Sequence, residues 1–291
     1  MAKRPKALSG TADMALLKRI AAALERLSPA ALPAKAPADG DAFVWEPAHG
    51  GLIGVPAVSA VPLSLLKGIE AARDTLLENT RRFANGLPAN NALLWGARGM
   101  GKSSLVKAVH AEVNRGAKGK VRLALVEIHR EEIASLPLLL RILRGDARRF
   151  LLYCDDLSFD KDDTSYKSLK AALEGGLEGR PENVLFYATS NRRHLMPRGH
   201  DETRGMLAAA EDAEEMVSVS DRFGLWIGFP PMDQPAYLAA VHAYADRFGL
   251  AAPDLERRAL QWSQGRGSRS GRVAFQFVRD LAGELGKPLP I

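Results

Sequence analysis

The chain has 291 residues, enough for one generous domain or two modest ones. Its hydrophobic content of 46% and charged content of 25% are those of an ordinary globular protein, and no apolar run reaches the length of a membrane span. The net charge of +6 suits an anionic partner such as nucleic acid, although an excess spread over the surface explains it equally well. The basic start lacks the apolar stretch of a signal peptide, so we expect a cytoplasmic protein.

Cysteine and histidine give no sign of a disulfide or of a metal site. Cys154 is the only cysteine, which excludes a disulfide within the chain. It lies in an apolar run, where a small buried side chain is expected. The six histidines lack the spacing of metal ligands.

The first forty residues are predicted to form an appendage. Residues 12–28 carry leucine and isoleucine at helical spacing, and residues 29–40 are rich in proline and alanine. We therefore assign residues 1–40 to an N-terminal helix and a linker. The helix either binds a partner or packs on its own domain.

Buried strands alternate with helices between residues 41 and 230. Residues 41–61 are rich in glycine and proline and are expected to lead into the domain as extended structure. Strands are predicted at residues 92–95, 121–128, 150–154, 184–189 and 225–229, and helices at 62–83, 104–113, 130–144 and 163–177. This alternation predicts a parallel five-stranded sheet with helices on both faces.

A second, all-helical unit is predicted after Pro230-Pro231, which ends the last strand. Its helices are expected at residues 234–248, 255–264 and 273–285. The predicted domains are therefore an α/β core at residues 41–230 and a small helical domain at residues 231–291.

A P-loop lies at the centre of the predicted core. The segment Gly96 to Ser103 reads Gly-Ala-Arg-Gly-Met-Gly-Lys-Ser, and it follows a predicted strand and precedes a predicted helix, as a P-loop does. Its glycines let backbone N–H groups surround a phosphate, and the helix directs its positive end at the same oxygens. Lys102 is expected on the β- and γ-phosphates and Ser103 on Mg²⁺. The predicted nucleotide-binding residues here are Gly96, Ala97, Arg98, Gly99, Met100, Gly101, Lys102, Ser103 and Ser104.

Polar residues also follow the next strands of the predicted sheet. Asp155 and Asp156 end the apolar run 150–154, and the carboxyl ends of parallel strands face the crevice where ligands bind. We expect Asp155 to hold Mg²⁺, and Asp156 to act as the general base or to orient the attacking water. Asn191 would position that water or respond to the γ-phosphate. The alternative for all three is a solvated turn after a strand.

The order of these motifs resembles that of the AAA+ ATPases. The matching elements are the P-loop, a Walker B strand from Leu151 to Asp156, sensor 1 at Asn191, an arginine finger at Arg222, sensor 2 at Arg272 and a helical lid. More narrowly, the residues from Gly86 to Ala108 resemble the stand-alone bacterial AAA+ proteins catalogued as a domain of unknown function. The resemblance covers residues 45–285.

This resemblance implies a P-loop NTPase αβα sandwich with a helical lid, with ATP and Mg²⁺ as its ligands. It implies that Ile69 lies against the adenine and that Arg272 reaches the γ-phosphate from the lid, although Arg269 competes for this role. Arg222 would act on a neighbouring subunit, so that the complete site exists only in a homo-oligomer such as a hexamer. Otherwise Arg222 pairs with an acid of its own chain.

The resemblance also implies a function, with two departures from the common AAA+ pattern. Asp156 stands where most AAA+ enzymes have glutamate, and residues 129–132 lack the aromatic pore loop of unfoldases. We expect Mg²⁺-dependent ATP hydrolysis that remodels a partner whose identity the sequence does not reveal. The alternatives are a nucleotide-controlled binding module with little turnover and a small-molecule kinase.

Overall fold

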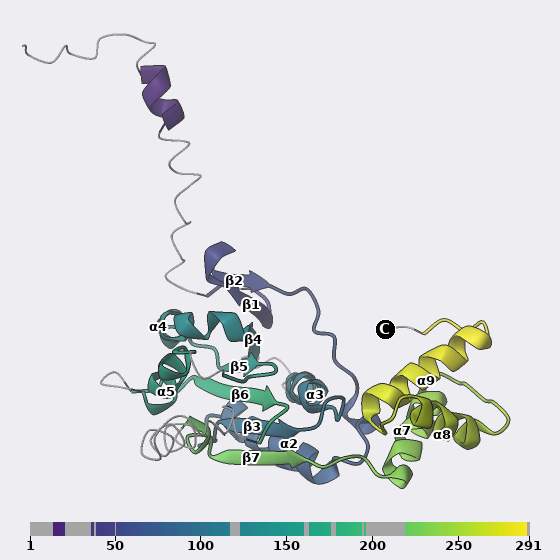
Figure 1. Cartoon of the computed structure of the whole chain (residues 1–291). Coiled ribbons are helices and arrows are strands. Elements are labelled where there is room, and N and C mark those ends of the chain that lie inside the picture. Colours follow the sequence, from purple (N-terminus) through teal and green to yellow (C-terminus); the bar gives the residue numbers. More distant parts are fainter. Residues whose placement is uncertain are drawn as a thin grey trace, which may run out of the picture.

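A seven-stranded sheet organises the described part of the chain (Figure 1). The computed structural model describes residues 14–20, 36–37, 39–49, 51–116, 123–159, 163–175, 179–193, 195 and 219–289. The strands are β1 (Ala42–Glu46), β2 (Gly51–Gly54), β3 (Ala92–Gly96), β4 (Ala124–Ile128), β5 (Phe150–Cys154), β6 (Val184–Ser190) and β7 (Leu225–Phe229). Their order across the sheet is β2-β1-β4-β5-β6-β3-β7.

The five predicted strands are all present and pair in parallel, in the order β4-β5-β6-β3-β7. Strand β1 adds to β4 in parallel, and β2 pairs with β1 as an antiparallel hairpin. The predicted number of five strands is therefore too low, because residues 41–61 contain this hairpin instead of a simple extended lead. Strand β2 reads Gly-Leu-Ile-Gly, which is too short and glycine-rich to show the alternation of a strand.

Helices cover both faces of the sheet, as predicted. The α-helices of this core are α2 (Glu70–Ala84), α3 (Lys102–Gly116), α4 (Leu136–Arg144) and α5 (Tyr166–Glu174), and its 3-10 helices are η1 (Pro47–His49), η2 (Leu63–Leu65) and η3 (Arg130–Ser135). Helices α2 and α3 bury Leu76 and Leu105 against one face. Helices α4 and α5 bury Leu139 and Leu169 against the other. This confirms the αβα sandwich.

Two predicted helices are divided in the structure. The helix expected at residues 62–83 consists of η2 and the later α2, because Gly68 between them has φ 75°, which a helix cannot accommodate. A Cβ at Gly68 would also lie 2.8 Å from the Cβ of Ala236. The helix expected at 130–144 is η3 followed by α4, which has Pro137 in its first turn.

The helices after β7 have their own core. They are α7 (Gln234–Arg247), α8 (Leu255–Gly265) and α9 (Gly271–Glu284). Their buried side chains include Tyr237, Val241 and Phe277, and Leu65 of η2 joins them. Asp233 caps α7 by accepting the N–H of Ala236 at 2.8 Å. Figure 1 shows this group of helices beside the carboxyl end of β3.

The N-terminal segment is described only in part. Residues 14–20 are helical, as predicted, and Met14, Leu16, Leu17 and Ile20 are exposed. The rest of the helix predicted at residues 12–28, and most of the linker at 29–40, lie outside the described residues. Within the described ranges, every helix is too short or too polar to cross a lipid bilayer.

Candidate functional site

The P-loop joins β3 to α3 and needs glycine for two different reasons. A Cβ at Gly96 would lie 2.3 Å from the carbonyl oxygen of Phe229 on the neighbouring strand. Gly99 has φ 79°, and a Cβ there would lie 2.9 Å from Oγ of Ser270 in the helical domain. Met100 is 6% exposed and anchors the loop in the core. The loop is thus packed between the sheet and α9.

Lys102 is the first residue of α3 and is only 6% exposed. Its ammonium donates hydrogen bonds to the carbonyls of Gly96 and Ala97, at 2.7 and 2.9 Å, and to Oδ1 of Asn191 at 3.1 Å. Burial lowers the pKa of Lys102, while the nearby Asp155 and Asp156 act in the opposite direction. The structure therefore brings the P-loop lysine and the predicted sensor 1 residue into direct contact.

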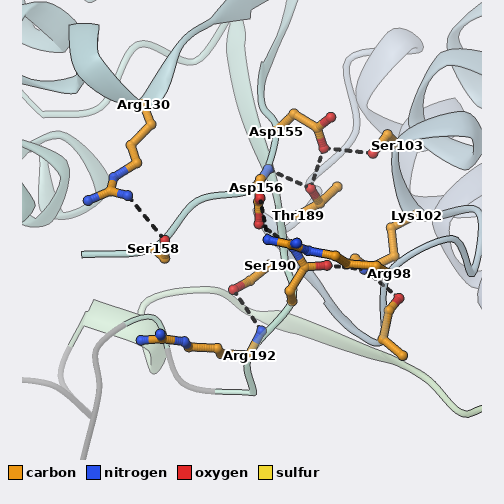
Figure 2. A network of polar contacts seen from close by, with 12 residues as sticks. Arg98, Lys102, Ser103, Arg130, Asp155, Asp156, Ser158, Thr189, Ser190 and Arg192 are labelled. Atoms are coloured by element: carbon orange, nitrogen blue, oxygen red, sulfur yellow. Dashed lines mark hydrogen bonds and ion pairs between the residues drawn. The ribbon is translucent and has the colours of Figure 1, made fainter. Parts of the chain in front are cut away.

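Asp155 follows β5 and accepts two short hydrogen bonds. Ser103 Oγ and Thr189 Oγ1 both donate to its Oδ1, at 2.6 and 2.5 Å (Figure 2). Partial removal from water acts to raise the pKa of Asp155, but the hydrogen bonds from Ser103 and Thr189 help to hold this pKa below its ordinary value. Asp155 is therefore a carboxylate at neutral pH, joined to the predicted metal ligand of the P-loop.

Asp156 has a different set of partners. Its backbone has φ 50°, uncommon for a residue with a side chain, and its N–H donates to Thr189 Oγ1 at 2.9 Å. Its carboxylate accepts a hydrogen bond of 2.5 Å from Asn191 Nδ2, and Nη2 of Arg98 lies 3.9 Å away. Asn191 thus lies beside the carboxylate of Asp156, as expected at this edge of the sheet, and it also connects Asp156 to Lys102.

Thr189 links the two aspartates and was not predicted. It is 1% exposed, and its hydroxyl accepts from Asp156 while donating to Asp155. The signal available in the sequence is a polar residue near the carboxyl end of the fully buried strand β6. A buried hydroxyl needs partners, and at that edge of the sheet they are the residues that follow β5.

One cavity of about 590 Å³ contains most of the predicted residues. Of these, Arg98, Gly99, Gly101, Lys102, Ser103, Ser104, Asp155, Asp156, Asn191 and Arg272 line it. Its apolar side chains, Val61, Leu66, Tyr244 and Phe275, were not predicted. The rings of Tyr244 and Phe275 meet edge to face with centroids 5.3 Å apart. A polar end and an aromatic end in one cavity fit a phosphate chain and a base.

Ile69 is not among the described residues that line this cavity. It is 8% exposed and belongs to the same apolar cluster as Leu66. A Cβ at Gly101 would lie 3.7 Å from both side chains. Leu66, which packs in the same cluster, lines the cavity in its place.

The three arginines from the end of α8 to the start of α9 lie in different places. Arg272 lines the cavity, and its backbone N–H donates to the carbonyl of Gly99 at 3.2 Å. Arg266 lies over the ring of Trp262, 5.0 Å from its centroid. Arg269 is close enough to Tyr237 to lower the pKa of that tyrosine, which burial raises to about 12. This placement favours Arg272 over Arg269 as the lid residue at the phosphates.

Arg222 is not brought to this cavity with the other predicted residues. It donates from Nε to Oε1 of Glu174 at 2.6 Å, and its Nη2 contacts the same oxygen. Glu174 is the last residue of α5. An ion pair within the chain is the alternative that the sequence left open, and it does not exclude a role in a neighbouring subunit.

Two residues near the P-loop have side chains that are suited to bind Mg²⁺. Ser103 and Asp155 offer a hydroxyl and a carboxylate, the hard oxygen ligands that Mg²⁺ prefers. Within the described residues, no group of three or more His, Cys, Asp or Glu side chains is arranged to hold a metal alone.

Comparisons with known proteins agree with this geometry. The model of the family described as protein of unknown function (DUF815) matches residues 38–285. No curated protein matches the chain.

Several solved structures share the fold. The RuvB Holliday junction branch migration motor of Thermotoga maritima is 15% identical with a TM-score of 0.50, over 78% of this chain and 66% of RuvB. The ORC1 protein of Aeropyrum pernix, solved in complex with DNA, is 16% identical with a TM-score of 0.54, over 75% of this chain and 65% of ORC1. The chain thus spans slightly less than two thirds of the length of each.

These findings bear on family and fold, since the structural relatives are too distant in sequence to transfer an activity. Over residues 38–285, the chain belongs to the DUF815 family of proteins of unknown function, and its fold is that of the AAA+ P-loop ATPases.

Proposed function

We propose that the protein binds ATP and hydrolyses it with Mg²⁺, and that hydrolysis drives the remodelling of a partner. The observation that carries this proposal is the path of hydrogen bonds from Lys102 through Asn191 to Asp156, beside the Ser103–Asp155 pair (Figure 2). It gathers at one edge of the sheet a cation, metal ligands and a carboxylate, which are the groups that phosphoryl transfer needs.

The phosphates are held from two sides in this proposal. Lys102 and the amides of the P-loop bind the β- and γ-phosphates, and Arg272 approaches the γ-phosphate from the lid. Ser103 and Asp155 hold Mg²⁺, which when bound offsets the negative charge of the phosphates. Tyr244 and Phe275 enclose the base.

The attacking water is placed by the neighbouring carboxylate. Asp156 orients this water and accepts its proton, and Asn191 fixes the carboxylate through the 2.5 Å hydrogen bond. Thr189 holds the backbone of Asp156, which keeps the carboxylate at the edge of the sheet.

Steady-state release of phosphate from Mg·ATP tests this activity. The Asp156→Asn variant is expected to lose about a hundredfold or more of the rate, because a general base contributes on that order. Asp254→Asn is the matched control, since Asp254 pairs with Arg257 on the surface of the helical domain. A rate in Asp156→Asn equal to that of the unmodified protein would remove the hydrolysis proposal.

A nucleotide-controlled binding module is the second candidate. It is favoured by the short side chain of Asp156, whose carboxylate is already engaged by Asn191 and lies near Arg98. In that case ATP fixes one conformation that binds a partner, and turnover is slow. A single-turnover rate that is no faster than that of Asp156→Asn, with ATP binding intact, would support the module over the enzyme.

We propose that the working form is a homo-oligomer, such as a hexamer, in which Arg222 of one chain serves the site of the next. Its position outside the cavity of its own chain supports this arrangement. We also retain the division into residues 1–40, 41–230 and 231–291, since the helices after β7 have a separate core.

The cytoplasm, which holds the cellular ATP pool, is the proposed location.

Nucleic acid is one candidate partner. The net charge of +6 supports it, and ORC1, which shares the fold, was solved in complex with DNA. Binding to duplex DNA that weakens steeply with salt is the expected result. Binding that is absent at low salt would exclude this partner and leave a protein client.

A further inference from the structure

A second cavity of about 360 Å³ adjoins the nucleotide cavity. Arg98, Asp155, Asp156 and Asn191 line both. The two cavities therefore meet at the carboxylates of the proposed reaction. The second cavity extends from this junction toward the loops that follow β4 and β5, whereas the aromatic pair and Arg272 line only the nucleotide cavity.

The rest of the second cavity is rich in hydrogen-bond donors. Arg130, Ser158 and Arg192 line it, and they come from the loops after β4, β5 and β6. Figure 2 shows Arg130 and Arg192 on the side of Asp156 that faces away from Lys102. Parallel strands thus bring three separate loops to one polar cavity.

Arg130 is held in place, whereas Arg192 reaches the cavity from an exposed position. Arg130 Nη1 donates to Ser158 Oγ at 3.4 Å, and its Nη2 lies 3.6 Å from Oδ2 of Asp163. Arg192 is anchored through its backbone N–H, which donates to Ser190 Oγ at 3.2 Å. Both arginines line the cavity.

The charges of the cavity fit a small oxyanion that carries a proton. Arg98, Arg130 and Arg192 supply guanidinium groups, which bind phosphate oxygens through paired N–H donors. Glu131, Asp155 and Asp156 line the same cavity as acceptors, and a hydrogen phosphate ion can donate its proton to a carboxylate. A fully ionised ligand lacks such a donor and would be repelled by these acids.

We propose that the second cavity binds the inorganic phosphate product and forms its way out of the site. This inference rests on the proposed hydrolysis of ATP. Beside Asp156, where the two cavities meet, the water oxygen bonds to the γ-phosphorus and its proton passes to Asp156. The bond from that phosphorus to the β–γ bridging oxygen breaks, and this oxygen leaves with ADP, which still occupies the first cavity. The phosphate reaches Arg130 and Arg192 without passing the nucleotide.

Equilibrium binding of inorganic phosphate to the full chain saturated with Mg·ADP tests this inference, because it does not require turnover. Isothermal calorimetry is expected to show one phosphate bound per chain. Arg192→Ala should weaken this binding about tenfold or more, since a charged hydrogen bond is lost. Affinity for Mg·ADP should stay unchanged. Arg193→Ala is the matched control, since Arg193 stacks over Trp95 at 5.2 Å and is not among the described residues of the cavity wall.

Two results would overturn the inference. One is that the ADP complex binds no phosphate. A neighbouring subunit that fills the cavity would give this result. The other is an equal loss, or no loss, of phosphate affinity in Arg192→Ala and Arg193→Ala. Either result can occur while ATP is hydrolysed at the normal rate, so failure here is distinct from failure of the proposed activity. If the protein binds phosphate but does not hydrolyse ATP, the result supports the phosphate site and contradicts the proposed hydrolysis.

Discussion

The hydroxyl of Thr189 gives two adjacent aspartates different surroundings. It donates to the carboxylate of Asp155 and accepts the backbone N–H of Asp156. Asp155 is thereby fixed beside Ser103, while Asp156 turns toward Asn191. In the proposed mechanism, these different surroundings let Asp155 hold Mg²⁺ while the adjacent Asp156 acts as the base.

Replacement of Thr189 by valine keeps the shape of the side chain but removes both hydrogen bonds. We expect Thr189→Val to lose about 1–3 kcal/mol of stability, because the N–H of Asp156 loses its acceptor, and to lower ATP turnover at least tenfold. Thermal unfolding and phosphate release measure the two effects. Thr189→Ser should restore both, and equal behaviour of the two variants would show that the hydroxyl is not needed.

The pKa of Asp155 predicts a pH dependence of stability. Its folded pKa lies below its ordinary value, so the carboxylate form stabilises the folded state above the unfolded pKa of about 3.9. That contribution is lost as the pH falls through the folded pKa. Denaturant unfolding between pH 6 and pH 3 should show a shallower loss of stability below pH 4 in Asp155→Asn than in the unmodified chain. Parallel curves would contradict the assignment.

At the scale of elements, the sequence predicts those with strong local signals. The parallel strands and the P-loop follow from apolar runs and from a glycine loop between a strand and a helix. The hairpin of β1 and β2 escapes prediction because Gly51 and Gly54 occupy both ends of its second strand. The division of the helix expected at residues 62–83 escapes because the backbone at Gly68 is fixed by its approach to Ala236, a contact between distant segments. The helix expected at residues 130–144 is instead a 3-10 helix up to Ser135, just before Pro137 in the first turn of α4.

The candidate site shows the same limit. Its charged and polar residues stand in motifs, so Lys102, Asp155 and Asn191 could be predicted. Its aromatic end could not, because Tyr244 and Phe275 lie far from the P-loop in the chain and have the spacing of core residues in their helices. Only the packing of the start of α9 against the P-loop, which the sequence does not show, brings both rings into the same cavity as the P-loop.

The start of α9 connects the helical domain to the P-loop and offers a test at this scale. Ser270 caps the helix by accepting the N–H of Val273 at 3.2 Å, and it lies against Gly99. Ser270→Ala should lower stability by about 1 kcal/mol and weaken ADP binding, because Arg272 is positioned by this turn. Ser270→Asp should retain the cap. If Ser270→Ala binds ADP as tightly as the unmodified chain, the helix cap does not contribute to nucleotide binding.

At the scale of the whole molecule, the question is whether Arg222 acts in the site of a neighbouring subunit or only forms an ion pair within its own chain. Its partner in the described structure is Glu174, at the end of α5 and outside the nucleotide cavity. If Arg222 serves a neighbour, its loss affects turnover more than stability. If it only pairs with Glu174, Arg222→Ala and Glu174→Ala should lower stability to the same extent and leave turnover unchanged.

Mixed assemblies test this directly. Arg222→Ala chains and Lys102→Ala chains should each be inactive alone, the first for lack of the neighbour's arginine and the second for lack of phosphate contacts. Mixed in equal amounts they should regain part of the activity, because a Lys102→Ala chain still offers Arg222 to an intact site. Phosphate release from the mixture is the measurement. A mixture no more active than its components would contradict the role of Arg222 in the neighbouring site.

The central claim is that the loop from Gly96 to Ser103 binds the phosphates of ATP, with Lys102 as its main cation. Calorimetric titration of Mg·ATP into the unmodified chain and into Lys102→Ala tests it most directly. We predict one nucleotide bound per unmodified chain, and an affinity at least a hundredfold lower in the variant, since charged hydrogen bonds to the phosphates are lost. No binding by the unmodified chain, or equal binding by the two proteins, would contradict the account.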